Sequence, residues 1–213
     1  MIVLKYSKTE SACFISHIDL LRHVSRILRR AEIKVNYSNG FHPHALVYFS
    51  PPLGVGVSSL SEYLAIDTDM SADDVFYRYN ASVPETLRAS EVFRCAKNPN
   101  LQGRVVCADY VFDTPYADID LSRGFEISYD KKGQSVREDV ADKIYSVFDA
   151  GGKLGLRLAL GNITLRPDRI IPKLNEILGA DICVTDVCKI KQYLDVNGEL
   201  TSADDYIKSA VLQ

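Results

Sequence analysis

The segment SHIDLLRHVSRILRRAE, residues 16–32, constrains the fold most strongly because it predicts an amphipathic helix with a marked beginning. Ser16 followed by Asp19 has the spacing of a capping box, with Asp in place of the usual Glu. Apolar residues recur every three or four positions and form one stripe: Leu20, Leu21, Val24, Ile27, Leu28 and Ala31. Because such a stripe must be buried, we expect the helix to cover a sheet.

The elements expected around this helix predict an α+β fold for the first half of the chain. Strands are expected at residues 2–8, 34–37, 45–49, 62–67 and 87–95, and a second helix at 71–82. Asn39-Gly40 is a turn signal between two of the strands. The order β-α-β-β-α-β over residues 1–96 is that of a ferredoxin-like antiparallel sandwich, in which both helices cover one face of the sheet.

The stretch KNPNLQG, residues 97–103, carries Asn, Pro and Gly and divides the chain into predicted domains 1–96 and 97–213. The second is expected to be a smaller, strand-rich α+β unit. Its predicted elements are strands at 105–113, 125–130, 144–149, 153–160 and 182–195, a Lys132-Gly133 turn, and helices at 167–178 and 203–211. Whether this unit repeats the fold of the first is left open by the residues.

Composition excludes several classes of protein. No apolar run approaches the roughly 20 residues of a membrane span, and MIVLKYSKTE lacks the apolar core of a signal peptide, so we expect a cytoplasmic protein without membrane contact. Five cysteines are scattered singly, which argues against a disulfide framework and a zinc ribbon. The chain also lacks a CxxxCxxC run, and we expect no cofactor.

Charge is distributed unevenly and indicates an anionic partner. Residues 1–50 carry a net charge of +4 and the rest −7, and all four histidines lie in the basic part: His17, His23, His42 and His44. On the helix, Arg22, Arg26, Arg29 and Arg30 share the face opposite the apolar stripe. Arginine forks suit phosphate, and exposed aromatic side chains stack on unpaired bases, so these arginines with Tyr37, Phe41, His42 and His44 form the predicted RNA-binding set.

Two other kinds of chemistry fit the same residues less well. Histidines at positions i and i+2 can share a metal on a strand, but no Cys or carboxylate stands nearby at a ligand spacing, so no metal site is predicted. General acid–base catalysis, as in metal-independent endoribonucleases, would use His17, His44 and Tyr37.

We expect the loop after residue 37 to fold back beside the helix and gather arginines and histidines into one basic concavity. Glu62 is interpreted as a partner of a nearby arginine.

Three segments carry a dense resemblance to a known family: FISHIDLLRHVSRILRRA at 14–31, YSNGFHPHA at 37–45 and PPLGVGVSSLSEYL at 51–64. They resemble the radical SAM-linked domain, a bacterial domain of unknown function. The resemblance departs from the family pattern at His42, where Asn is usual, and at Ala45 and Leu46, where Pro and a basic residue are usual.

The resemblance implies a protein encoded beside, or fused to, a radical SAM protein, with a substrate related to RNA or the ribosome. We therefore expect a non-catalytic accessory protein of a separately encoded radical SAM enzyme, which binds or positions an RNA or ribosome-associated substrate. The first alternative is a metal-independent endoribonuclease that uses His17 or His44. The second is a protein–protein adaptor for the radical SAM partner that makes no nucleic-acid contact.

Overall fold

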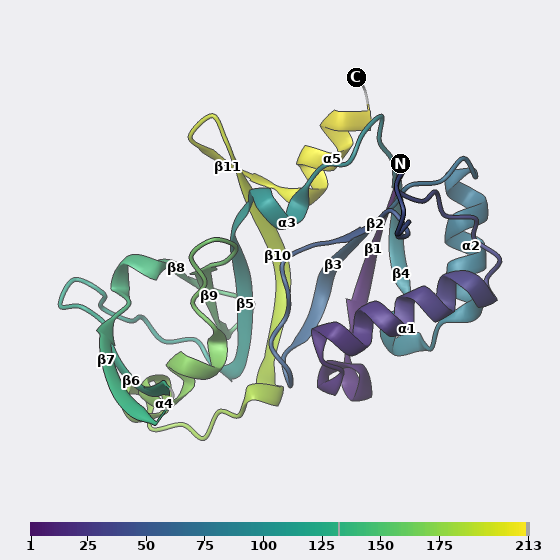
Figure 1. The fold of residues 1–213 in the computed structure, drawn as a ribbon. Coiled ribbons are helices and arrows are strands. Elements are labelled where there is room, and N and C mark those ends of the chain that lie inside the picture. The colour runs from purple at the N-terminus through teal and green to yellow at the C-terminus, as the bar shows by residue number, and fades with distance from the viewer. Residues whose placement is uncertain (132, 212–213) are drawn as a thin grey trace.

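The computed structural model describes residues 1–131 and 133–211 and confirms the predicted α+β class (Figure 1). The N-terminal elements are β1 (Ile2–Lys8), α1 (His17–Arg30), β2 (Val47–Phe49), β3 (Ser58–Ile66), α2 (Ala72–Ser82) and β4 (Ala89–Arg94). They are followed by α3 (Leu101–Arg104), β5 (Val105–Pro115), β6 (Glu126–Lys131), β7 (Gln134–Asp139), β8 (Ile144–Asp149), β9 (Lys153–Ala159), α4 (Pro167–Leu178), β10 (Val187–Val196), β11 (Glu199–Ser202) and α5 (Ala203–Val211). No helix of these residues is long and apolar enough to cross a membrane.

Helix α1 forms as its sequence predicts. The Ser16 hydroxyl caps it by accepting a hydrogen bond from the backbone N–H of Asp19 at 3.2 Å. The Asp19 carboxylate accepts from the Ser16 hydroxyl, which ties the cap to the first turn. The buried residues of the helix all come from the predicted apolar stripe: Leu20, Val24, Ile27 and Leu28. The stripe thus fixes which side of α1 is left for the solvent.

The strands assemble into one large, mostly antiparallel sheet. Among the described residues it has nine strands, in the order β4-β1-β3-β10-β5-β9-β8, with β2 also paired to β3 and β11 to β10. β2 pairs with the end of β3 near Leu64, whereas β10 pairs in parallel with its beginning, at Ser58 and Ser59. β3 is therefore the strand at which elements from both ends of the chain meet.

Strands from both predicted domains share this sheet. β1 to β4 come from residues 1–96, and β5, β8, β9, β10 and β11 come from the rest of the chain. The pairing of β3 with β10 joins the two sets by hydrogen bonds. The predicted boundary segment, residues 97–103, begins before the short helix α3 and covers all but its last residue. The division into two domains stays a prediction.

Several predicted elements differ from those observed. Residues 34–37 form no strand; a single bridge joins Tyr37 to Ala45, and Asn36 donates its backbone N–H to Asp67 instead of to a ladder. The predicted strand 45–49 is reduced to β2, because Ala45 takes part only in that single bridge with Tyr37. The sequence also missed α3, β7 and β11. The predicted Lys132-Gly133 turn lies partly outside the described residues, because Lys132 is not among them.

Both faces of the central strands are buried, which explains their nearly continuous apolar sequences. Leu4 and Leu64 belong to the hydrophobic cluster beneath α1 and α2. Val3 and Tyr63 alternate with them and belong to a second cluster, which includes Ile207 of α5. α5 therefore packs on the face of β1 and β3 opposite α1. This arrangement leaves the outer side of α1 and the β2 edge as open surface.

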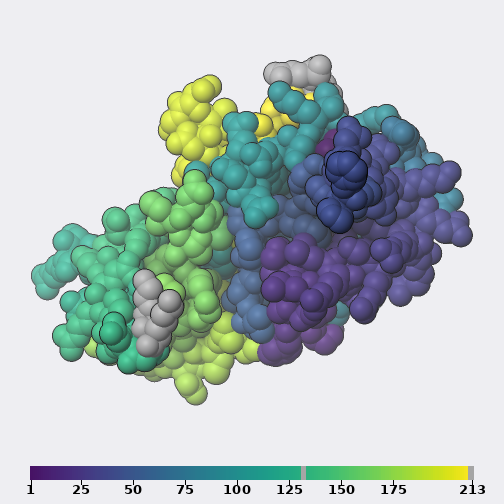
Figure 2. All heavy atoms as spheres, in the orientation of Figure 1, coloured from purple at the N-terminus to yellow at the C-terminus, as the bar shows by residue number. Residues whose placement is uncertain are grey.

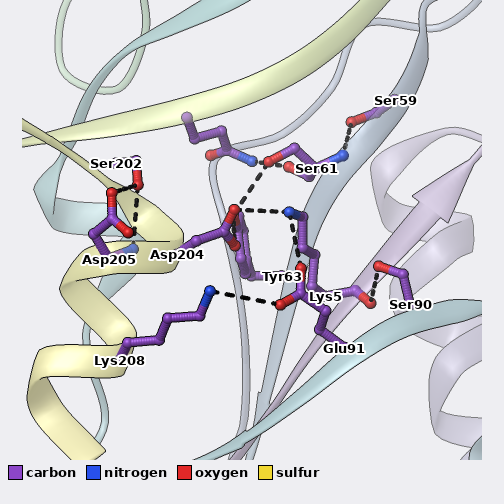
Figure 3. Close-up of polar contacts among 11 residues, drawn as sticks. Lys5, Ser59, Ser61, Tyr63, Ser90, Glu91, Ser202, Asp204, Asp205 and Lys208 are labelled. Carbon is purple, nitrogen blue, oxygen red and sulfur yellow. Dashed lines mark hydrogen bonds and ion pairs between the residues drawn. The ribbon is translucent and has the colours of Figure 1, made fainter.

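Polar contacts fasten α5 to this second face (Figure 3). Asp204, near the start of α5, accepts a hydrogen bond from Lys5 of β1 at 2.7 Å and another from the Tyr63 hydroxyl of β3 at 2.8 Å. Lys5 also lies 3.3 Å from Glu91 of β4. Because these residues are bound to one another, the cluster anchors the C-terminal helix.

Candidate nucleic-acid interface

The four predicted arginines of α1 all lie on its exposed side. Arg22 contacts Asp19 at 3.4 Å, but both side chains are largely exposed, so the pair is weak. Arg30 donates a hydrogen bond to the backbone carbonyl of Ser82 at the end of α2. Among the described residues, no acidic side chain lies within ion-pair distance of Arg26 or Arg29. The face thus offers cations that an external phosphate can contact.

The loop of residues 37–44 folds back on itself and is closed by Ser38 and His44. The backbone N–H of Ser38 donates to the carbonyl of His44 at 2.9 Å, and the N–H of His44 donates to the Ser38 hydroxyl at 3.1 Å. The same hydroxyl lies 2.8 Å from Nδ1 of His44. Gly40 has φ of +121°, a conformation that other residues rarely adopt. The loop is visible as dark blue spheres on the surface in Figure 2.

A groove of about 310 Å³ separates this loop from α1, and we name it the α1 groove. Its apolar walls are Leu28, Ile33, Val35, Ala45 and Val47. Its polar groups are Ser25, Arg29, Tyr37 and His44, and Pro43 completes the lining. A hollow that combines apolar walls with a few polar groups is the usual form of a small-molecule site. The arginine among those groups adds a contact for an anion.

The α1 groove brings together only some of the predicted residues. Arg29, Tyr37 and His44 line it, whereas Arg22, Arg26 and Arg30 do not. The side chains of Phe41 and His42 are exposed on the loop without lining the groove, and Phe41 is fully exposed, at 102%. His17, at the other end of α1, lines a different cavity. The single basic concavity that the sequence predicts is therefore two cavities along one helix.

The second cavity is small and almost enclosed, and we name it the polar pocket. Its volume is about 10 Å³. Its lining comes from β1, α1, β2, β3 and the segment between β2 and β3: Tyr6, Lys8, His17, Leu20, Phe49, Ser50, Leu53 and Glu62. Only His17 and Phe49 among these are partly exposed, so they form the mouth. Their rings contact each other edge to face, with centroids 5.9 Å apart.

Charged side chains are buried around the polar pocket. Lys8 is 1% exposed and donates to the backbone carbonyls of Cys13 and Ile15, at 3.3 and 2.8 Å. Glu62 is 4% exposed, and one of its carboxylate oxygens lies 2.7 Å from Nζ of the fully buried Lys189. The contact has the distance of an ion pair but not the angles of a hydrogen bond. Glu62 is thus partnered by a lysine of β10, not by a nearby arginine as the sequence suggested.

Burial also shifts the titration of the residues around the polar pocket. It lowers the pKa of His17 below the ordinary 6.5; the charge of Lys8 lowers this pKa further, and that of Glu62 raises it in part. Burial also lowers the pKa of Lys8, against the opposing effect of Glu62. At neutral pH the His17 imidazole is therefore uncharged and has one donor and one acceptor nitrogen.

Sequence reasoning missed most of the polar pocket. Lys8 and Ser50 carry no local signal, because Lys8 lies on β1 and Ser50 directly follows β2, and they meet only when the sheet forms. Glu62 was singled out from the sequence, but with an arginine as its partner in place of Lys189. No three His, Cys, Asp or Glu side chains gather as metal ligands in the part of the chain that the structure describes.

Comparison with known proteins yields one family. A model described as "Uncharacterized protein conserved in bacteria (DUF2344)" matches residues 1–150. This range contains the α1 groove and every residue that lines the polar pocket. No curated protein matches the chain.

Proposed function

The chain belongs to this uncharacterized bacterial family, and from that premise we propose that it is an accessory protein that binds single-stranded RNA along α1. The base of one nucleotide would enter the α1 groove, and its phosphate would contact Arg29. Neighbouring phosphates would contact Arg22, Arg26 and Arg30. Tyr37, Phe41 and the two loop histidines, His42 and His44, would contact or stack on the bases.

The observation that carries the proposal is the composition of the α1 groove. It combines apolar walls with Arg29, Tyr37 and His44, all of which are exposed. Arg29 faces no acid among the described residues, so a phosphate would not have to displace an existing partner. The fully exposed Phe41 offers a second ring for stacking. Unpaired bases suit such a surface because they can leave a strand and stack on aromatic side chains.

The radical SAM partner is the second part of the proposal. It is supported by the resemblance of residues 14–64 to the radical SAM-linked domain and by the absence of a CxxxCxxC run from the sequence. On this account the partner performs the chemistry, while this chain presents an RNA or a ribosomal component to it.

The strand order β4-β1-β3-β2, with antiparallel neighbours, supports a ferredoxin-like arrangement of residues 1–96.

A binding titration with a fluorescent single-stranded RNA tests the proposal. We expect the double variant Arg29→Ala/Tyr37→Ala to weaken binding by at least about tenfold, because it removes a phosphate contact and a stacking contact. Arg123→Ala is the matched control, since the Arg123 side chain is 90% exposed and lies outside both cavities. Wild-type protein that binds no RNA, or binding unchanged in the double variant, would favour the adaptor alternative.

The same titration distinguishes binding from cleavage. The endoribonuclease alternative would use His17 or His44, which line separate cavities. We expect bound RNA to remain intact over hours at neutral pH without metal. Site-specific cleavage that is lost in both His17→Ala and His44→Ala would support the endoribonuclease instead.

A further inference from the structure

The polar pocket has a size and a lining that the proposed function does not use. Its volume of about 10 Å³ admits one water-sized group and excludes a nucleobase or a whole phosphate. His17 and Phe49 form a partly exposed mouth, so a group at the edge of a larger ligand can enter from outside. The size alone limits the occupant to a single small group.

The charges in the lining restrict the occupant further. An anionic group in this space would lie against the Glu62 carboxylate, and a cationic group would lie against the Lys8 ammonium. Both charges are buried, where repulsion is screened far less than in water. A neutral group avoids both conflicts. The lining therefore favours an uncharged occupant.

The hydrogen-bonding groups complete the description of this occupant. Glu62 Oε1 is occupied by the ion pair with Lys189, but among the described residues Oε2 accepts only a long hydrogen bond, from the Ser50 hydroxyl at 3.5 Å, and can accept a second one. Lys8 directs two of its three possible hydrogen bonds to backbone carbonyls, which leaves one donor. The uncharged His17 imidazole offers one donor and one acceptor. A group that both donates and accepts through one atom satisfies this set, and a hydroxyl is such a group.

The position of the polar pocket indicates which hydroxyl. His17 lines the polar pocket, and Ser25 lines the α1 groove. The two residues are eight positions apart on α1, which corresponds to about 12 Å along the helix axis. This distance is a few nucleotides of a single strand, whose charges recur about every 3.4 Å when stacked. We propose that the polar pocket binds the 2′-hydroxyl of a ribose in the strand whose base occupies the α1 groove, so that the protein selects RNA over DNA. The inference rests on the proposed RNA binding.

Strands that differ only at the 2′ position test this inference with the unaltered protein. The probes are one RNA sequence, its DNA counterpart, and 2′-fluoro and 2′-O-methyl versions. We expect RNA to bind about tenfold more tightly than DNA, because DNA lacks the hydroxyl. The 2′-fluoro strand should bind no better than DNA because it cannot donate, and the 2′-O-methyl strand should bind no better because its methyl group does not fit.

A variant at the mouth locates the effect. His17→Phe fills the entrance, and it should lower the affinity for RNA to that for DNA while leaving DNA binding unchanged. His23→Phe, on the same helix but outside both cavities, should keep the preference for RNA. Equal binding of RNA and DNA by the unaltered protein, or a preference that survives His17→Phe, would overturn the inference and leave the proposed function standing. Failure of every strand to bind would overturn the proposed function itself.

Discussion

The two cavities along α1 differ in how their charged groups are used. In the α1 groove, Arg29 and His44 are exposed, and the groove contains no acidic side chain. In the polar pocket, Lys8 and Glu62 are buried and bound to other parts of the protein. A charged side chain that is exposed and unpaired contributes little to folding and is available to a ligand. One that is buried and paired is costly to disturb.

The position of the buried ion pair between Glu62 and Lys189 explains this difference. Glu62 lies on β3 and Lys189 on β10, the two strands through which the N-terminal and C-terminal sets of strands are joined. Gln192 of β10 adds hydrogen bonds to Ser50 and to the carbonyl of Ser61. The contacts behind the polar pocket therefore hold the sheet together, whereas those around the α1 groove are free to serve binding. Four experiments can break or sharpen this contrast.

Removing the buried carboxylate should have the largest effect. Glu62→Ala leaves Lys189 as an unpaired buried charge, and we expect the free energy of unfolding to fall by about 3–5 kcal/mol in urea denaturation. The double variant Glu62→Leu/Lys189→Met removes both charges and should recover most of this loss. Glu126→Ala, in the exposed pair with Arg137, is the control and should cost less than about 1 kcal/mol. A loss below about 1 kcal/mol for Glu62→Ala would contradict a structural role for the pair.

Changes on the loop should affect binding and not stability. Tyr37 and Phe41 are exposed, so Tyr37→Ala/Phe41→Ala should leave the free energy of unfolding within about 0.5 kcal/mol of the wild type. If each ring stacks on a base, RNA affinity should fall by about 1–3 kcal/mol per ring in the same titration. Tyr77→Ala, which removes an exposed ring on α2, provides the comparison. If Tyr37→Ala/Phe41→Ala and Tyr77→Ala bind RNA with equal affinity, Tyr37 and Phe41 do not stack on bases.

A smaller effect is expected from the pH dependence of His17. Because its folded pKa lies below the ordinary 6.5, the unfolded chain takes up this proton first as the pH falls. The free energy of unfolding should therefore decrease as the pH falls below 6.5, until the pH reaches the pKa of His17 in the folded protein. His17→Gln should lack this part of the dependence, and His23→Gln should retain it. An NMR titration that placed the pKa of His17 above 6.5 would refute the assignment.

The contrast between the cavities also explains what the sequence could predict. α1 was found with its cap and its buried face because Ser16, Asp19 and the apolar stripe are local signals. The exposure of the four arginines and the return of the loop toward α1 followed from the same local reasoning. The polar pocket could not be found in this way, because Lys8, Ser50 and Glu62 become neighbours only through the pairing of β1 and β2 with β3.

The failed strand prediction at 34–37 has a comparable cause. The apolar pattern of that segment is satisfied by packing, since Ile33 is buried and Val35 is partly buried against the cluster beneath α1 and α2. Its backbone instead bonds to residues 67 and 68, because Asn36 donates to Asp67 and the Lys34 carbonyl accepts from Thr68. Burial alone does not distinguish such a segment from a strand.

The salt dependence of RNA binding tests the central claim most directly. If the arginines of α1 contact phosphates, the logarithm of the binding constant should fall linearly with the logarithm of the salt concentration. Arg29→Ala should reduce the magnitude of that slope by ~0.7, and Arg123→Ala, far from α1, should leave it unchanged. A slope that is the same in wild type and Arg29→Ala, or RNA binding that is insensitive to salt, would contradict the account.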